Sequence, residues 1–138
     1  MQHQIEKICV VGSLSCDMVM RVPRRPQKGE TIIGSEFRTF VGGKGNNQAL
    51  AAARAGGIVS MVGRVGRDHF GDMIEAKLKS SSVDCRYLFR DDEVSTGIAD
   101  ILVTPDGDNS ICIAPQANGR LSFDNVSASR EVIAQSKF

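Results

Sequence analysis

The stretch VGGKGNNQALAAAR occupies residues 41–54 and decides how the rest of the chain is arranged. Its glycines, Gly42, Gly43 and Gly45, disfavour helix because glycine loses the most backbone entropy on folding. The alanine-rich run behind them favours helix. We therefore expect a tight loop that leads into a helix N-terminus, with Asn46 or Asn47 as the helix cap.

A loop of this kind has a definite binding chemistry. The first N–H groups of the helix are free, and the positive end of the helix dipole lies beside them. Missing side chains at Gly42 and Gly43 let a ligand approach the backbone. The spacing does not fit a nucleotide loop, since Gly45 follows Lys44 and Gln48 stands where G-x-G-x-x-G needs glycine. These features predict a polyol rather than a nucleotide phosphate.

The composition limits the other function classes. The chain has 138 residues, of which 41% are hydrophobic and 24% charged, with a net charge of +1 and no tryptophan. This predicts one globular domain with a real core. Neither the charge balance nor the aromatic content favours nucleic acid or an anionic membrane as a partner.

Cysteine and histidine usage points to a reducing compartment. The four cysteines have no C-x-x-C spacing, and we expect them to be reduced and buried. His3 and His69 lie far apart in the sequence, so no metal site is predicted. The N-terminus has no long apolar segment, so we expect neither a signal peptide nor a membrane span, and a cytoplasmic location.

Two kinds of strand pattern occur along the chain. The apolar run 8–12 predicts a strand of a parallel sheet that is buried on both faces, and 58–65 and 85–89 predict further strands of it. We expect residues 13–17 to form the loop at the carboxyl end of the first strand, where open α/β sheets bind ligands. Asp17 is the first carboxylate there, with a ligand role or a turn-capping role.

A second, smaller sheet follows from alternating residues. Residues 17–22 and 31–41 alternate between apolar and polar, as do the arms 97–104 and 110–114 of a predicted hairpin. Such strands have one solvated face, so we expect them to lie over the loop edge of the main sheet.

The remaining segments complete a strand–helix alternation. Helices are predicted from the glycine loop to Gly56, over residues 70–78 and over 122–135. The acidic run 91–93 is expected to be a solvated connection. The pattern ends on a helix with no strand after it, which predicts the front part of a longer α/β protein.

Several short motifs resemble those of the ribokinase-like (PfkB) family of carbohydrate kinases, in the same order from about Ile8 onward. The glycine loop with Asn47 is the most specific of them. The quoted residues are Val11-Gly12-Ser13-x-x-x-Asp17, Gly29-Glu30-Thr31, Gly42-Gly43-Lys44-Gly45-x-Asn47-Gln48-Ala49, Val65-Gly66-x-Asp68-x-Phe70-Gly71, Ser95-Thr96-Gly97 and Ala117-Asn118.

The resemblance implies a fold and a domain organisation. Residues 1–138 would be the N-terminal, sugar-binding part of a three-layer α/β kinase domain, a mostly parallel sheet with helices on both faces. Lid strands would lie at about 17–41 and 96–114 and could pair with the lid of a second copy. The C-terminal, nucleotide-binding half would be absent.

The resemblance also implies roles for individual residues. The sugar, ribose or a related pentose, would be held by the segment at Asp17 and by the glycine loop. Asp17 would accept hydrogen bonds from hydroxyls, and Asn47 would bridge a hydroxyl pair. The catalytic aspartate and the contacts to ATP, Mg²⁺ and a monovalent cation (K⁺) would lie outside this chain, which therefore has no catalytic or cofactor-binding residue. The implied substrate-binding residues are Ser15, Cys16, Asp17, Gly42, Gly43, Lys44, Gly45, Asn46 and Asn47.

Two departures keep alternatives open. Ser15 stands where such kinases usually have asparagine, and a hydroxyl offers fewer hydrogen bonds than an amide, so another sugar or a nucleoside remains an alternative substrate. Gln116 stands where glycine is common. Outside catalysis, the chain could be a truncated protein that binds a sugar or pairs through its lid strands. A nicotinamide-binding domain would need a glycine fingerprint that the sequence lacks.

Overall fold

The computed structural model describes residues 5–138, so His3 lies outside the described part. The elements in chain order are β1 (Lys7–Val11), β2 (Ser15–Arg21), β3 (Glu36–Gly42), α1 (Lys44–Arg54), β4 (Ile58–Gly66), α2 (His69–Ser80), β5 (Asp84–Asp91), β6 (Gly97–Val103), β7 (Asn109–Ala114), the 3₁₀ helix η1 (Gln116–Arg120), α3 (Phe123–Ala128) and α4 (Arg130–Gln135). No helix in the described range is long and apolar enough to cross a membrane.

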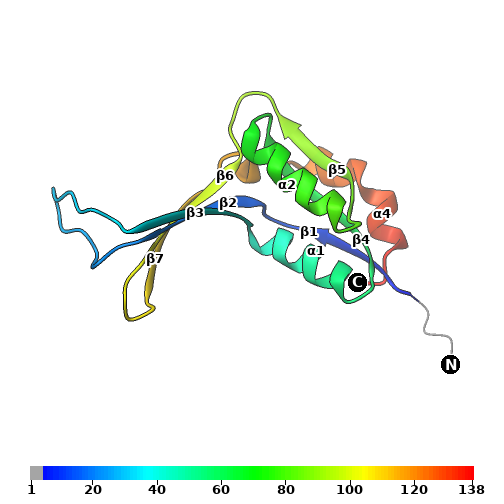
Figure 1. Ribbon diagram of the computed structural model, residues 1–138. Helices are drawn as coiled ribbons and strands as arrows, with labels where there is room; N and C mark the ends of the chain where they lie inside the picture. Colours follow the sequence, from blue (N-terminus) through cyan, green and yellow to red (C-terminus); the bar gives the residue numbers. More distant parts are fainter. Residues whose placement is uncertain (1–4) are drawn as a thin grey trace.

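The strands form two sheets, as the sequence patterns predict. One has three parallel strands in the order β1-β4-β5. The other has four strands in the order β3-β2-β6-β7, with antiparallel pairs at both sides and a parallel pair between β2 and β6. This second sheet projects away from the helices to one side of the molecule (Figure 1). The predicted α/β class is confirmed.

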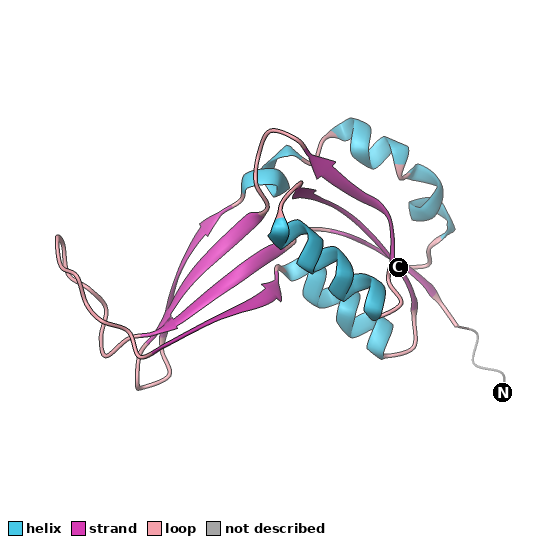
Figure 2. Cartoon of the chain, turned by 45° about the horizontal axis from the view of Figure 1, so that its top comes forward, coloured by secondary structure: helices cyan, strands magenta, loops and turns pink. Residues whose placement is uncertain are grey.

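Helices cover both faces of the parallel sheet (Figure 2). The connections β1 to β4 and β4 to β5 step in one direction, and right-handed crossovers then place α1 and α2 on the same face. After β7 the chain returns over the other face through α3 and α4. Its end reaches the free edge of β1, where the Lys137 N–H donates to the Lys7 carbonyl and the Cys9 N–H to the Phe138 carbonyl, both at 2.9 Å. β1 is an edge strand of this sheet, and its carboxyl end lies at the side of the sheet where open α/β proteins bind ligands.

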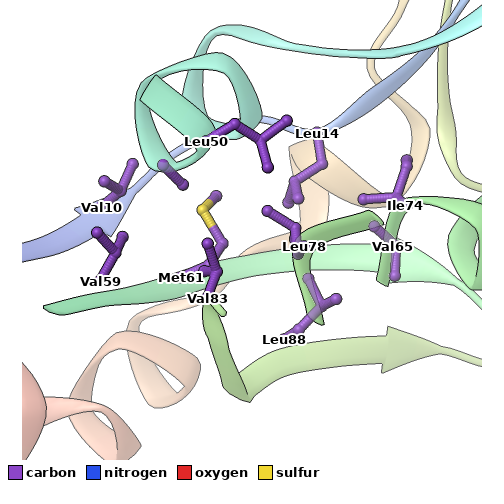
Figure 3. Close-up of a cluster of buried hydrophobic side chains, with 11 residues drawn as sticks. Val10, Leu14, Leu50, Val59, Met61, Val65, Ile74, Leu78, Val83 and Leu88 are labelled. Atoms are coloured by element: carbon purple, nitrogen blue, oxygen red, sulfur yellow. The ribbon is translucent and has the colours of Figure 1, made fainter. Parts of the chain in front are cut away.

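The hydrophobic core lies between the parallel sheet and the α1–α2 layer (Figure 3). Leu14, Met61, Ile74 and Leu78 are fully buried in it. On the opposite face, α3 and α4 contain no buried residue apart from Ser129 between them. The α1–α2 layer is therefore the well-packed side that fixes the position of the glycine loop.

Three local predictions are corrected. The fully buried strand is β4 rather than β1, because β1 lies at the edge and Val11 is 47% exposed. Residues 31–35 are not a strand, because β2 ends at Arg21, and of these residues only Ser35 pairs with it, through its N–H to the Arg21 carbonyl at 2.9 Å. The helix predicted over 122–135 is divided at Ser129, whose hydroxyl donates to the Asn125 carbonyl at 2.9 Å.

The cysteines are all free, but their burial differs from the prediction. Cys16 is buried and Cys9 and Cys85 are half-buried, whereas Cys112 is exposed. Cys112 lies on β7, an edge strand of the second sheet, which is not covered by helices. The strand assignment was correct, but the pattern did not show that both faces of this sheet are largely open.

The prediction for the acidic run 91–93 is corrected at one residue: Asp91, the last residue of β5, is only 2% exposed, whereas Asp92 and Glu93 are exposed as predicted. The Asp91 carboxylate accepts from Arg64 Nε at 2.7 Å and from the backbone N–H groups of Glu93 and Val94 at 2.9 Å. Arg120 Nε of η1 lies 3.1 Å away. Burial alone would raise the pKa of this carboxyl, but these N–H groups and the Arg64 charge outweigh it and lower the pKa to about 2.

Replacing Asp91 should change how the stability of the protein depends on pH, because its carboxyl has a lowered pKa. The folded pKa lies below the ordinary value of 3.8, so the stabilisation is complete above that value and is lost as pH falls towards 2. We expect Asp91→Asn to lower the urea midpoint at pH 7, and the difference from the parent chain to shrink between about pH 4 and pH 2. The control is Asp92→Asn, whose exposed pair with Arg67 should contribute little. A difference that does not change with pH would contradict the role of the ionised carboxylate.

Candidate functional site

The glycine loop turns into α1 earlier than the sequence predicts. The helix begins at Lys44, and its N-cap is Gly43, with φ of 92° and no side-chain cap hydrogen bond. The expectation that Asn46 or Asn47 caps the helix was therefore wrong. Gly43 makes the turn in a left-handed conformation that favours glycine. Among the described residues, the N–H groups of Lys44 and Gly45 find no acceptor, as is usual in the first turn of a helix, and of these two residues Lys44 is exposed whereas Gly45 is buried.

The loop packs on the end of β1 through backbone contacts alone. A Cβ on Gly45 would lie 2.7 Å from the carbonyl carbon of Gly12, and a Cβ on Gly12 would lie 2.9 Å from the Gly45 Cα. A Cβ on Gly43 would meet the Leu14 Cα at 2.7 Å. Only glycine fits at these positions, which explains why Gly45 is kept inside the first turn of a helix despite its low propensity.

The carboxylate of Asp17 lies directly against the same loop. A Cβ on Gly42 would come within 2.1 Å of Asp17 Oδ2, so the carboxylate occupies the space that a side chain would take. Ser15 Oγ donates to Asp17 Oδ1 at 2.7 Å and fixes its orientation. The sequence predicted a loop over 13–17, but Ser15 to Asp17 belong to β2. The strand therefore holds this carboxylate rigidly.

Strand register shows what shares a face with Asp17. Phe40, Asp17, Ala99 and Ile113 stand opposite one another across the four strands. Phe40 and Ile113 are 49% and 66% exposed. This row places apolar side chains on both sides of the carboxylate, and we call it the Asp17 row.

Cys16 points to the other face of β2, in register with Val41 and Ile98, and its side chain is fully buried. Burial, and then the charges of Asp17 and Asp68, raise the pKa of this thiol. Of the three residues predicted in this segment, Ser15 and Asp17 thus face the loop, whereas Cys16 contributes only its backbone.

The three side chains of the first helical turn differ in accessibility. Lys44 and Asn47 are exposed, whereas Asn46 is fully buried. Asn46 Nδ2 donates to Asn47 Oδ1 at 3.2 Å. Asn47 therefore presents an exposed amide next to the loop, and its contact with a sugar stays a prediction.

Asn118 is a structural residue of the site to which the sequence assigned no role. Its Oδ1 accepts from the Leu14 N–H at 2.9 Å, and its Nδ2 donates to the Leu14 carbonyl at 2.6 Å. These two bonds replace a strand partner between β1 and β2. The amide requires Gly97, since a Cβ there would lie 2.3 Å from Nδ2. The only signal in the sequence was the Ala117-Asn118 motif.

Asp68 ties the second sheet to the helical layer. Its carboxylate caps α2 by accepting from the Gly71 N–H at 2.9 Å, and it accepts from both the N–H and the hydroxyl of Thr96 at 2.7 Å. Burial would raise the pKa of Asp68, but these hydrogen bonds lower it on balance. The start of β6 is thereby held at a fixed distance from α2.

Comparison with known families now adds to this geometry. The model of the pfkB family carbohydrate kinases matches residues 5–138. The chain belongs to the pfkB family of carbohydrate kinases. The family expectation drawn from the glycine loop and its accompanying motifs is confirmed.

Individual relatives in this pfkB family agree in identity and fold. The chain is 46% identical to the ribokinase of Bacillus subtilis strain 168 over 114 residues, which is 83% of this chain and 39% of the relative. It is 36% identical to the deoxyribokinase of Salmonella typhi, over 90% of this chain and 40% of the relative. The structure of Arabidopsis thaliana ribokinase complexed with ribose and ATP superimposes with a TM-score of 0.81 at 31% identity, over 96% of this chain and 44% of that one. The chain spans about two fifths of the length of these relatives.

The backbone also accounts for one departure from the family pattern. Gln116 has φ of 49°, in the left-handed region that favours glycine. A glycine would adopt this φ without strain, which gives a backbone reason why glycine is common at this position. The side chain lines a cavity of about 340 Å³ with Met18, Asp68 and Phe70.

The contact between Gly42 and Asp17 can be tested by mutation. Gly42→Ala should lower the free energy of unfolding by about 1–3 kcal/mol, because the new methyl group displaces the carboxylate. Since all three of the nearest atoms belong to Asp17, the double variant Gly42→Ala/Asp17→Ala should recover most of this loss. Urea unfolding measures both.

Gly119→Ala is the matched control for Gly42→Ala, because its nearest contact would be at 3.8 Å. We expect its unfolding free energy to stay within about 0.5 kcal/mol of the parent chain. If Asp17→Ala does not relieve the Gly42→Ala defect, the carboxylate does not occupy the space above Gly42.

Proposed function

We propose that this chain is the sugar-binding and lid part of an ATP-dependent carbohydrate kinase that accepts ribose or a related pentose. The observation that carries the proposal is the Asp17 carboxylate, oriented by Ser15 and seated against Gly42 beside the free N–H groups of α1. Ribokinases among the relatives support the substrate class.

The arrangement suits a polyol because it combines fixed acceptors and donors. Asp17 Oδ1 is occupied by Ser15, so Oδ2 accepts from a sugar hydroxyl. Asn47 and the first N–H groups of α1 supply donors on the other side of the loop. Groups held this firmly orient the sugar without further loss of entropy on binding.

The four-stranded sheet acts as the lid in this proposal. The apolar members of the Asp17 row, Phe40, Ala99 and Ile113, face the sugar and keep water from it. Water exclusion matters in phosphoryl transfer because water competes with the sugar hydroxyl as acceptor. The exposed apolar side chains on this face, Ile111 among them, also suit pairing with the lid of a second copy.

The nucleotide is assigned to a part of the protein beyond these residues. In the intact enzyme, ATP supplies the γ-phosphoryl group that is transferred to a primary sugar hydroxyl, the 5-hydroxyl for ribose. Residues 5–138 offer no group of three or more His, Cys, Asp or Glu side chains that could hold a metal ion, and we assign neither Mg²⁺ nor K⁺ to any of them. The four free cysteines agree with the cytosolic location that we propose.

Two alternatives have a structural basis. A non-catalytic protein that binds a sugar or pairs through its lid is favoured by the exposed apolar face around Ile111 and Ile113. Another sugar or a nucleoside is favoured by Ser15, whose hydroxyl is engaged with Asp17 and contacts a ligand less readily than a longer amide would.

Calorimetry of Asp17→Asn tests the proposal. A hydrogen bond to a charged group contributes about 1.5–3 kcal/mol, so ribose affinity should fall by about 10- to 150-fold. Asp100→Asn is the matched control, because Asp100 lies in the same sheet, exposed and on the opposite face. Equal ribose affinity in Asp17→Asn and the parent chain would exclude Asp17 as the acceptor, and binding of 2-deoxyribose or a nucleoside in place of ribose would support the alternative substrate.

The purified 138-residue chain should have no kinase activity. No phosphate-binding glycine loop of the nucleotide type occurs in it, and the resemblance to the pfkB family implies a catalytic aspartate that is not among these residues. A coupled assay for ADP formation with ribose and ATP measures this. Sugar-dependent ADP formation that co-purifies with the chain and disappears in Asp17→Ala would contradict the assignment of catalysis to residues outside this chain.

A further inference from the structure

Asn46 stands out among the buried polar groups of the molecule. Its side chain is fully buried on the core side of α1. Within residues 5–138, its Oδ1 is the one buried side-chain oxygen or nitrogen that has no hydrogen-bond partner. Buried polar atoms are normally paired, because an unpaired one loses its hydration without compensation.

The amide at Asn46 is therefore unfavourable for stability. Alanine has a higher helix propensity than asparagine and would leave no unpaired atom. The backbone role of the residue, donation from its N–H to the Ser13 carbonyl at 3.1 Å, needs no amide side chain. The one contact that does need it is the 3.2 Å hydrogen bond from Nδ2 to Asn47 Oδ1.

This contact determines how Asn47 is presented. With Oδ1 held by Asn46, the Nδ2 group of the exposed Asn47 keeps its hydrogens available as donors. The same design occurs across the loop, where Ser15 holds one oxygen of Asp17 and leaves the other free. Asn47, which is exposed, and Asp17, which is half-buried, are thus each held by a buried neighbour, so the site offers a fixed donor and a fixed acceptor.

We propose that Asn46 is a positioning residue, which orients the Asn47 amide for a polyol at the expense of stability. The inference rests on the proposed function, in which Asn47 contacts the sugar. It goes further by predicting opposite effects of one substitution, because removing the Asn46 amide should maintain or increase stability while it weakens sugar binding.

The variants Asn46→Ala, Asn47→Ala and their combination test this. Asn46→Ala should unfold at an equal or higher urea concentration, yet bind ribose about 3- to 10-fold more weakly by calorimetry. The double variant should bind no more weakly than Asn47→Ala alone, since Asn46 acts only through Asn47. Gln48→Ala, an exposed amide on the same helix, is the matched control and should leave the affinity unchanged.

Unchanged ribose affinity in Asn46→Ala, or fully additive losses in the double variant, would overturn the proposal. Should the parent chain bind no sugar, the proposed function fails, and the positioning role is decided by NMR. In that case the side-chain amide protons of Asn47 should move to random-coil shifts and sharpen in Asn46→Ala, and an unchanged pair of signals would overturn the inference.

Discussion

The contact between Gly12 and Gly45 is the constraint on which the rest of the structure depends. Backbone meets backbone there, with no space for a Cβ on either residue. This approach seats the N-terminus of α1 on the carboxyl end of β1, at the side of the sheet where open α/β proteins bind ligands. It also directs the chain through Gly43 so that Gly42 lies beneath the Asp17 carboxylate. A larger residue at any of these positions would separate the helix from the strand or displace the carboxylate from Gly42.

Around this contact, buried polar groups keep the site in one geometry. Asn118 pairs with both backbone groups of Leu14 where the chain passes from one sheet to the other. Asp68 joins α2 to the start of β6 through Thr96. These long-range hydrogen bonds tie the second sheet to the helical layer and to the end of β1, close to the point where Asp17 contacts the glycine loop. They connect segments far apart in the chain, which makes the site a product of the whole fold.

Much of the architecture could be predicted from the sequence, because strand periodicity, glycine positions and turn residues act locally. The alternation within β2, β6 and β7 identified the second sheet, and the glycine loop indicated where the candidate site lies. What failed depends on partners that a local pattern does not specify. Val11 is apolar but lies on an edge strand, and Cys112 is exposed because no layer covers its sheet. Asp91 was read as solvated, since its partners Arg64 and Arg120 come from distant segments. The buried amide of Asn46 gave no sequence signal, because asparagine is ordinarily a surface or capping residue.

The central claim is that the end of β1, the start of β2 and the first turn of α1 form one polyol site. A titration of the ¹⁵N-labelled chain with ribose, followed by backbone amide NMR signals, tests it most directly. The account predicts saturable shifts at residues 15–17 and 42–47, with the amide of Gly107 in the distant hairpin turn unchanged. Shifts confined to other segments would contradict it, as would the absence of any saturable shift over the whole range of ribose concentrations.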